Sequence, residues 1–88
     1  MKLVYKTSFA RDLRQIHDKA LLNRLVEVMQ EIEAASGIQG IAGLKKIARE
    51  SAYYRLRLGD YRLGLKIEAD TATLVRILHR KDIYRYFP

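Results

Sequence analysis

The sequence contains no cysteine, no long apolar run and no low-complexity segment. Without cysteine, disulfides and thiolate zinc sites are excluded. A small secreted domain usually needs such cross-links, so their absence favours a reducing compartment. No apolar run approaches the ~20 residues that span a bilayer, and residues 1–13 lack the apolar region of a signal peptide. We therefore expect a cytoplasmic protein without membrane association.

What the sequence does contain is an excess of positive charge on a globular composition. Its 88 residues are 49% hydrophobic and 31% charged, with a net charge of +7. A chain of this length predicts one domain, residues 1–88, and its hydrophobic content argues against disorder. Residues 51–88 carry eight basic and four acidic residues, against nine and six in residues 1–50. The excess serves either solubility or attraction to phosphates or an acidic partner, and we favour the attraction.

The first half of the sequence predicts a short strand followed by a helical hairpin. Residues 2–6 have a β-like composition. Apolar residues then recur at helical spacing between residues 9 and 16, with Asp12 expected to face solvent. A second apolar stripe covers residues 21–32, and Asp18 can cap its helix by accepting from free backbone N–H groups. Both stripes are expected to share one core.

The second half predicts a sheet. A glycine-containing loop runs to about residue 46, and alternating apolar and polar side chains follow on both sides of Gly59-Asp60. That dipeptide is typical of a two-residue hairpin turn. Strands are expected at residues 53–58, 61–68 and 73–78, and the tail, residues 79–88, is expected to fold back as a short turn or helix.

The predicted fold class is α+β. The order is an N-terminal strand, a two-helix hairpin and an antiparallel three-stranded meander (β-α-α-β-β-β), with a short C-terminal turn or helix. Helices on one face of a sheet bury that face, so we expect the other face to be open to solvent or a partner.

This second face is expected to be basic. Side chains two apart on a strand share a face, so Arg55 and Arg57 should project together, beside Arg62 and Lys66 of the neighbouring strand. Gly64 lies between the last two and leaves a gap where a ligand backbone could approach. A solvated face would usually carry mixed charges, so the pattern indicates an anion-binding surface.

Two motifs resemble those of one toxin superfamily. The run YRLRLGDYRL at residues 54–63 resembles the central hairpin of RelE/ParE-type toxins, Y-[RK]-[LIV]-[RK]-x-G-x-Y-R-[LIV]. The run HRKDIY at residues 79–84 resembles the closing motif of the same toxins, H-R-x-[DE]-[LIV]-Y. Leu44 resembles the leucine that leads to the hairpin, although Lys45 or Lys46 replaces the usual glycine after it. The resemblance covers nearly the whole chain.

The resemblance implies the toxin of a type II toxin–antitoxin system. Toxins of the RelE branch enter the ribosomal A site and cleave messenger RNA, with the RNA 2′-hydroxyl as nucleophile and without metal or cofactor. Such a cut needs a group to accept the 2′-OH proton, cations to stabilise the phosphate and an acid for the leaving 5′-oxygen. The implied partners are the ribosome with its message and a cognate antitoxin, in a possible toxin–antitoxin heterotetramer.

The same resemblance suggests which residues act. The candidate catalytic residues are Arg57, Arg62, His79, Arg80 and Tyr84. The candidate RNA-binding residues are Arg55, Lys66 and Lys81, and no metal ligands are expected.

Two types of side chain differ in their capacity for proton transfer. Arg55 and Arg57 replace lysines of the best-known RelE toxins, and arginine cannot serve as a base because it stays protonated. His79 is therefore the candidate for proton transfer, since imidazole titrates near neutrality, although a structural role for it stays open. His17 is expected to be a surface residue.

Two other functions remain open at this point. ParE-type relatives share the fold but poison DNA gyrase and are not nucleases. A degenerate toxin could also act only by binding its antitoxin and repressing its own operon. Arg62, Arg80 and Tyr84 favour the ribonuclease, whereas the lysine-to-arginine changes argue against it.

Overall fold

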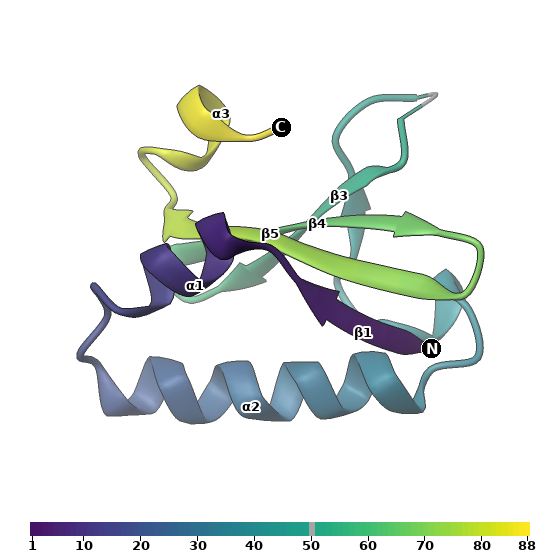
Figure 1. The fold of residues 1–88 in the computed structure, drawn as a ribbon, viewed down its shortest axis with the longest axis horizontal. Helices are drawn as coiled ribbons and strands as arrows, with labels where there is room; N and C mark the ends of the chain where they lie inside the picture. The colour runs from purple at the N-terminus through teal and green to yellow at the C-terminus, as the bar shows by residue number, and fades with distance from the viewer. Residues whose placement is uncertain (50) are drawn as a thin grey trace.

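The computed structural model describes residues 1–49 and 51–88 (Figure 1). Its order of elements confirms the predicted fold class. The elements of the described residues are β1 (Lys2–Tyr5), α1 (Thr7–Leu13), α2 (Lys19–Ala34), a 3-10 turn (Ile38–Gly40), β2 (Lys45–Lys46), β3 (Tyr53–Leu58), β4 (Tyr61–Glu68), β5 (Thr71–His79) and α3 (Ile83–Tyr86).

The strands form one sheet in the order β1-β5-β4-β3-β2. β3, β4 and β5 are the predicted antiparallel meander, and Gly59 of the first turn has the positive φ of 60° that such turns require. β1 joins the far edge in parallel with β5, with Lys2 opposite Thr71. The loop expected up to about residue 46 is wrong at its end, where Lys45 and Lys46 form the strand β2. Two residues are too few to show alternation, and they become a strand only by pairing with β3.

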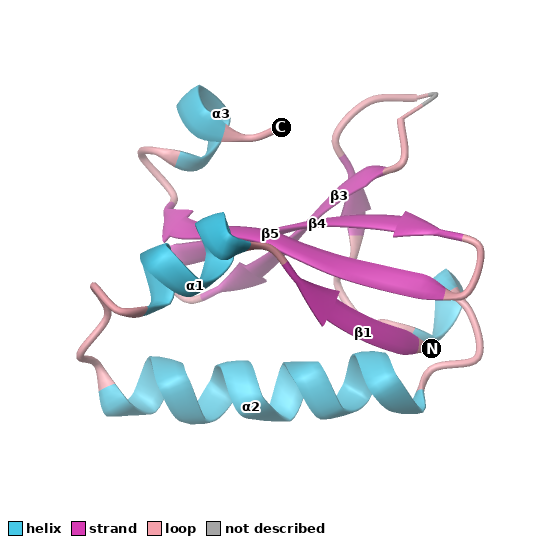
Figure 2. Cartoon of the chain, viewed as in Figure 1, coloured by secondary structure: helices cyan, strands magenta, loops and turns pink. Residues whose placement is uncertain are grey.

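The main core lies between one face of the sheet and α2 (Figure 2). The carboxylate of Asp18 accepts from the backbone N–H groups of Ala20 and Leu21 at 3.0 and 3.2 Å, which confirms it as the cap. None of the helices that the structure describes is long and apolar enough to cross a membrane. The buried residues of α2 are Leu21, Leu25, Val28 and Ile32, and they meet the inward side chains of the strands, among them Leu56, Leu58, Leu63, Leu65, Leu74 and Ile77.

α1 covers the part of the β5 edge that β1 leaves free. The hydroxyl of Ser8 donates to the carbonyl of Val75 at 2.6 Å, and the backbone N–H of Ile77 donates to the Asp12 carboxylate at 3.0 Å. The same carboxylate accepts two bonds from the Arg76 guanidinium, at 2.7 and 2.9 Å. Asp12 is therefore 9% exposed, not solvent-facing as its place in the helical pattern predicted. Its partners lie more than 60 residues away, beyond any local signal.

The opposite face of the sheet is only partly open, which corrects a second expectation. α3 and the tail fold back over it (Figure 1), and Ile83 and Phe87 are buried there, apart from the main cluster. The ring of Phe87 lies against Gly64 and meets Tyr53 edge-on, with 5.6 Å between ring centroids. Gly64 thus receives an aromatic ring of its own chain where a ligand backbone was expected.

Candidate active site

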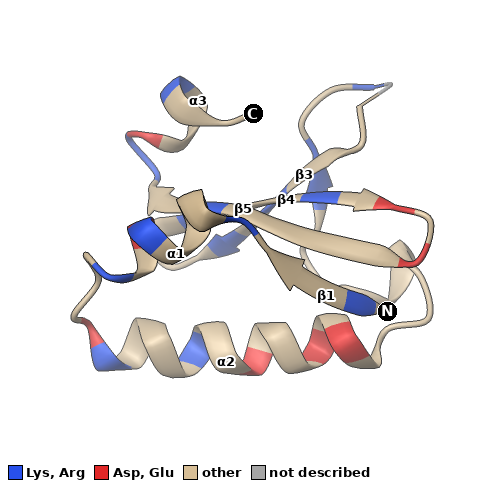
Figure 3. Ribbon diagram, viewed as in Figure 1, with Lys and Arg blue, Asp and Glu red and all other residues tan. Residues whose placement is uncertain are grey.

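A cavity of about 210 Å³ opens on the face that α3 partly covers. Strand register assembles it: Arg57 lies opposite Arg62 in the β3–β4 ladder, and Lys45 lies opposite Arg55 in the β2–β3 ladder. Residues directly opposite each other point to the same side of a sheet. Figure 3 shows the resulting concentration of basic residues on β3 and β4. The cavity is lined by Gly43, Lys45, Arg55, Arg57, Arg62 and Tyr84.

Burial and the concentration of positive charge in this cavity shift the pKa of Arg62. Burial, and then the positive charges of Arg57, Arg80 and Arg55, lower the pKa of the Arg62 guanidinium, while Asp60 raises it. Its Nη1 donates to the carbonyls of Gly59 and Tyr61, both at 2.9 Å, which anchors the side chain to the hairpin turn. A lowered pKa means that the folded protein disfavours this positive charge. A bound phosphate would supply the missing counter-charge.

Tyr84 forms the aromatic wall of the cavity. The guanidinium carbon of Arg55 lies 5.2 Å from the centroid of the Tyr84 ring, within the range of a cation–π interaction. Tyr84 belongs to α3, whose neighbours Ile83 and Phe87 are buried against the sheet. These buried neighbours hold Tyr84 in place. Because Tyr84 itself is 61% exposed, its ring stays available to an incoming base.

Four predicted residues lie outside the lining of this cavity, and three of them are basic. Arg80 is exposed, 4.0 Å from the Asp60 carboxylate, and its charge still reaches Arg62. Lys81 is exposed on the segment after β5. Lys66 pairs with Glu68 at 3.2 Å, which offsets part of its charge. Positive charge is therefore most concentrated at the cavity, and the basic residues around it are partly offset by neighbouring carboxylates.

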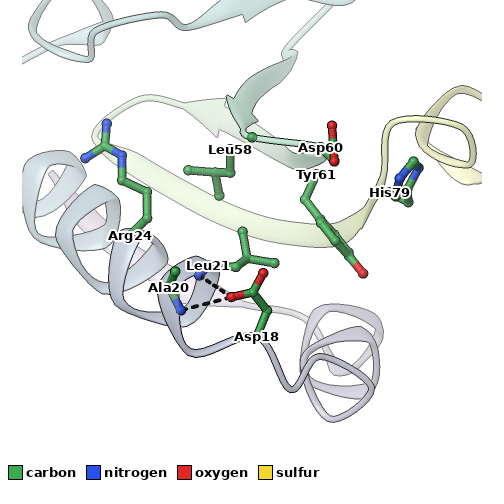
Figure 4. Close-up of a pocket in the computed structure, with 9 residues that line it drawn as sticks. Asp18, Ala20, Leu21, Arg24, Leu58, Asp60, Tyr61 and His79 are labelled. Atoms are coloured by element: carbon green, nitrogen blue, oxygen red, sulfur yellow. Dashed lines mark hydrogen bonds between the residues drawn. The ribbon is translucent and has the colours of Figure 1, made fainter.

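His79 lies on the other side of the sheet. It pairs with Tyr61 in the β4–β5 ladder, in phase with the buried pair of Leu63 and Ile77, and its ring meets the Tyr61 ring edge-on at 5.6 Å. Both rings line a separate cavity of about 370 Å³ between the start of α2 and the β3–β4 turn (Figure 4). The Nδ1 atom of His79 accepts the backbone N–H of Lys81 at 3.2 Å. His17 is exposed, as expected.

Lys45 is the residue of this cavity that the sequence pattern did not identify. In the sequence, Lys45 was noted only as one of two residues that replace the glycine usually found after Leu44. Lys45 lies beside Arg55 because β2 pairs with β3, and no alternating pattern in the sequence predicted β2. Among the described residues no group of three or more potential metal ligands comes together. The cavity thus combines three guanidinium groups, one amine and one phenol, a set suited to binding and stabilising an anion.

A comparison with known protein families decides the classification. A model described as the ParE toxin of the type II toxin–antitoxin system parDE matches residues 3–84. The chain belongs to this family. It is therefore a toxin of the type II toxin–antitoxin class, as its two motifs predicted.

Individual relatives of this toxin agree with the family assignment. Toxin RelE3 of Methanocaldococcus jannaschii is 34% identical over 90 residues, covering 100% of both chains. The crystal structure of a RelB–RelE antitoxin–toxin complex from Methanococcus jannaschii matches with a TM-score of 0.80 and 32% identity, covering 97% of this toxin and 99% of that chain. An archaeal RelE–RelB complex from Pyrococcus horikoshii OT3, at 19% identity and a TM-score of 0.71, covers 90% and 93% and shares the fold.

Proposed function

We propose that this toxin is a metal-independent endoribonuclease that cleaves messenger RNA on the ribosome, with the RNA 2′-hydroxyl as nucleophile. The cavity carries the proposal: three guanidinium groups and one amine converge beside an exposed tyrosine. Single-stranded RNA offers both features that such a site can bind, a phosphate and an unstacked base. The full-length likeness to a toxin named RelE supports the same branch of the family.

In the proposed reaction Arg57 and Arg62 hold the scissile phosphate. Guanidinium groups form paired hydrogen bonds to phosphate oxygens, and these two side chains lie opposite each other in the ladder. Their charges stabilise the five-coordinate phosphate more than the ground state, which is what accelerates the step. Tyr84 stacks on the adjacent base, and Arg80 with Lys81 and Lys66 attracts the flanking backbone.

Cleavage of a defined message in a translating extract tests this function. Primer extension should reveal new 5′ ends that appear only when ribosomes are present. The Arg62→Ala toxin should produce them at least about a hundredfold more slowly, the loss typical of removing one group that stabilises transition-state charge. Arg11→Ala removes an exposed basic charge on α1 and serves as the matched control, with an unchanged rate.

Two further outcomes separate the alternatives. Intact message together with arrested DNA supercoiling would assign the toxin to gyrase poisoning and remove the catalytic role of Arg62. The proton-transfer role predicted for His79 is tested in the same assay, because His79→Gln keeps a polar side chain but removes the titratable ring. An undiminished rate would leave His79 a structural residue beside Tyr61.

We also propose that a cognate antitoxin neutralises the toxin through an acidic segment. The protein carries a net charge of +7, and four of its basic side chains line the cavity. Burial and then repulsion by neighbouring arginines lower the pKa of Arg62, and an acidic chain laid over the cavity would offset the repulsion. Co-expressed antitoxin should therefore abolish message cleavage, and loss of its acidic residues should restore the cleavage.

A further inference from the structure

The cavity contains a single amine among its guanidinium groups. Lys45 is exposed and projects from β2 beside Arg55, on the same side of the sheet as Arg57 and Arg62. Its neighbour Lys46 points the other way, because side chains alternate along a strand. The Nζ atom of Lys46 donates to the carbonyl of Arg49 at 3.3 Å and lies 6.0 Å from the centroid of the Tyr54 ring. Of the two lysines in β2, Lys45 therefore points into the cavity and Lys46 points to the opposite face of the sheet.

The proposed cleavage requires a proton that the arginines cannot deliver. When the phosphorus–5′-oxygen bond breaks, the leaving oxygen becomes an alkoxide unless a donor protonates it. Guanidinium groups keep their protons, whereas an ammonium group can transfer one. The phenol of Tyr84 is the competing donor, but its ring contacts Arg55 and stacks on the adjacent base in the proposed reaction. His79, the candidate from the sequence, lines the cavity on the other face.

We propose that Lys45 is the general acid of this site, an inference that rests on the proposed ribonuclease function. The 2′-oxygen forms its bond to phosphorus while the bond to the 5′-oxygen breaks. The 2′-hydroxyl proton passes to solvent water, and the Lys45 ammonium gives its proton to the leaving oxygen. The products are a 2′,3′-cyclic phosphate and a 5′-hydroxyl end, and water then reprotonates the amine.

The lack of cysteine makes a direct chemical test possible. In Lys45→Cys the new thiol is unique in the chain, and 2-bromoethylamine converts it to a lysine analogue with a sulfur in the stem. Lys45→Cys should cleave ribosome-bound message at least about a hundredfold more slowly, the usual worth of general acid catalysis. Alkylation should restore the rate to within about tenfold, and Lys45→Arg should stay as slow as Lys45→Cys. Lys46→Cys is the matched control, with an unchanged rate before and after alkylation.

The pH profile and a modified message identify the role of the restored amine. Sulfur withdraws electrons from the amine of the analogue, so the alkaline loss of activity should begin at a lower pH than in the unmodified toxin. A message with sulfur in place of the leaving 5′-oxygen needs no general acid, because a thiolate leaves without a proton. On that message Lys45→Cys should be within a few fold of the unmodified toxin, well short of the hundredfold general-acid effect.

The possible failures are distinguishable. If the unmodified toxin leaves ribosome-bound message intact, the proposed function falls and the role of Lys45 falls with it. If the unmodified toxin cleaves and Lys45→Arg is equally fast, Lys45 contributes charge alone and the general acid is another group. An equal loss on the oxygen and sulfur messages would likewise exclude proton donation.

Discussion

Gly64 fixes how closely the C-terminal tail approaches the sheet. A Cβ atom built at this position would lie 2.8–2.9 Å from three atoms of the Phe87 ring, closer than non-bonded carbon atoms approach. Phe87 is 4% exposed and cannot move outward without losing that burial. We expect Gly64→Ala to lower the free energy of unfolding by about 1–3 kcal/mol, the usual cost of overpacking, as measured by urea denaturation.

The control for this prediction removes the ring. In a Phe87→Ala background the methyl group that Gly64→Ala adds meets no ring, so the second substitution should cost little. A coupling between the two positions of about 0.5–3 kcal/mol is expected in a double-mutant cycle. Equal costs in both backgrounds would contradict the contact and point to backbone effects at Gly64.

Among the elements, α1 depends on a partly buried ion pair for its place beside β5. Asp12 binds both Arg76 and the backbone N–H of Ile77, so Asp12→Ala leaves a buried donor unpaired and the guanidinium without its partner. We expect a loss of about 3 kcal/mol in the free energy of unfolding, at the lower end for broken buried pairs because Arg76 keeps some solvent contact. Arg24→Ala, which breaks exposed pairs with Glu27 and Glu31, should cost under about 1 kcal/mol.

The contribution of Arg76 to this stability should not vary over ordinary pH. Its hydrogen bonds to Asp12 raise its pKa above the usual arginine value, although burial opposes them. A raised pKa in the folded state gives stabilisation that is complete below the pKa of arginine in the unfolded chain, which lies far above neutrality, and is lost only as pH rises through the folded pKa. Comparing Arg76→Met with the unmodified toxin at pH 6 and pH 9 should therefore give the same difference in unfolding free energy.

Elements with a local signal were predictable from the sequence, and those that depend on distant partners were not. Alternation around Gly59-Asp60 predicted β3 and β4, and therefore grouped Arg55, Arg57 and Arg62. The parallel pairing of β1 with β5 and the two-residue β2 involve partners elsewhere in the chain. For the same reason Lys45 was not identified as part of the cavity, and the closing motif did not reveal that His79 and Tyr84 lie on opposite faces.

Over the whole molecule, charge is unevenly distributed. Acidic residues gather on the second half of α2 and at the turn between β4 and β5, whereas the middle of the sheet carries Arg55 and Arg57 on β3 and Arg62 and Lys66 on β4 (Figure 3). A single-stranded RNA bound at the cavity would release condensed counterions, so its affinity should fall steeply with salt.

The slope of that salt dependence counts the contacts. For single strands each phosphate contact contributes about 0.7 to the slope of log affinity against log salt concentration. Arg57→Ala should lower the slope by about this amount, and Arg11→Ala on α1 should leave it unchanged. Fluorescence anisotropy of a labelled oligoribonucleotide across a salt series measures both. Identical slopes for the two variants would mean that the phosphates bind elsewhere.

The pairing of β1 with β5 also sets an order on biosynthesis. β1 is made before the other strands of the sheet, yet the residue opposite Lys2 is Thr71, and Tyr84 follows later still. Such non-local pairing delays folding until the distant partner is available. A nascent chain that has not reached β5 therefore has an unpaired first strand and an unfinished cavity. A premature stop codon before Tyr84 would remove the aromatic wall of the cavity, so we expect the released fragment to be inactive as a toxin.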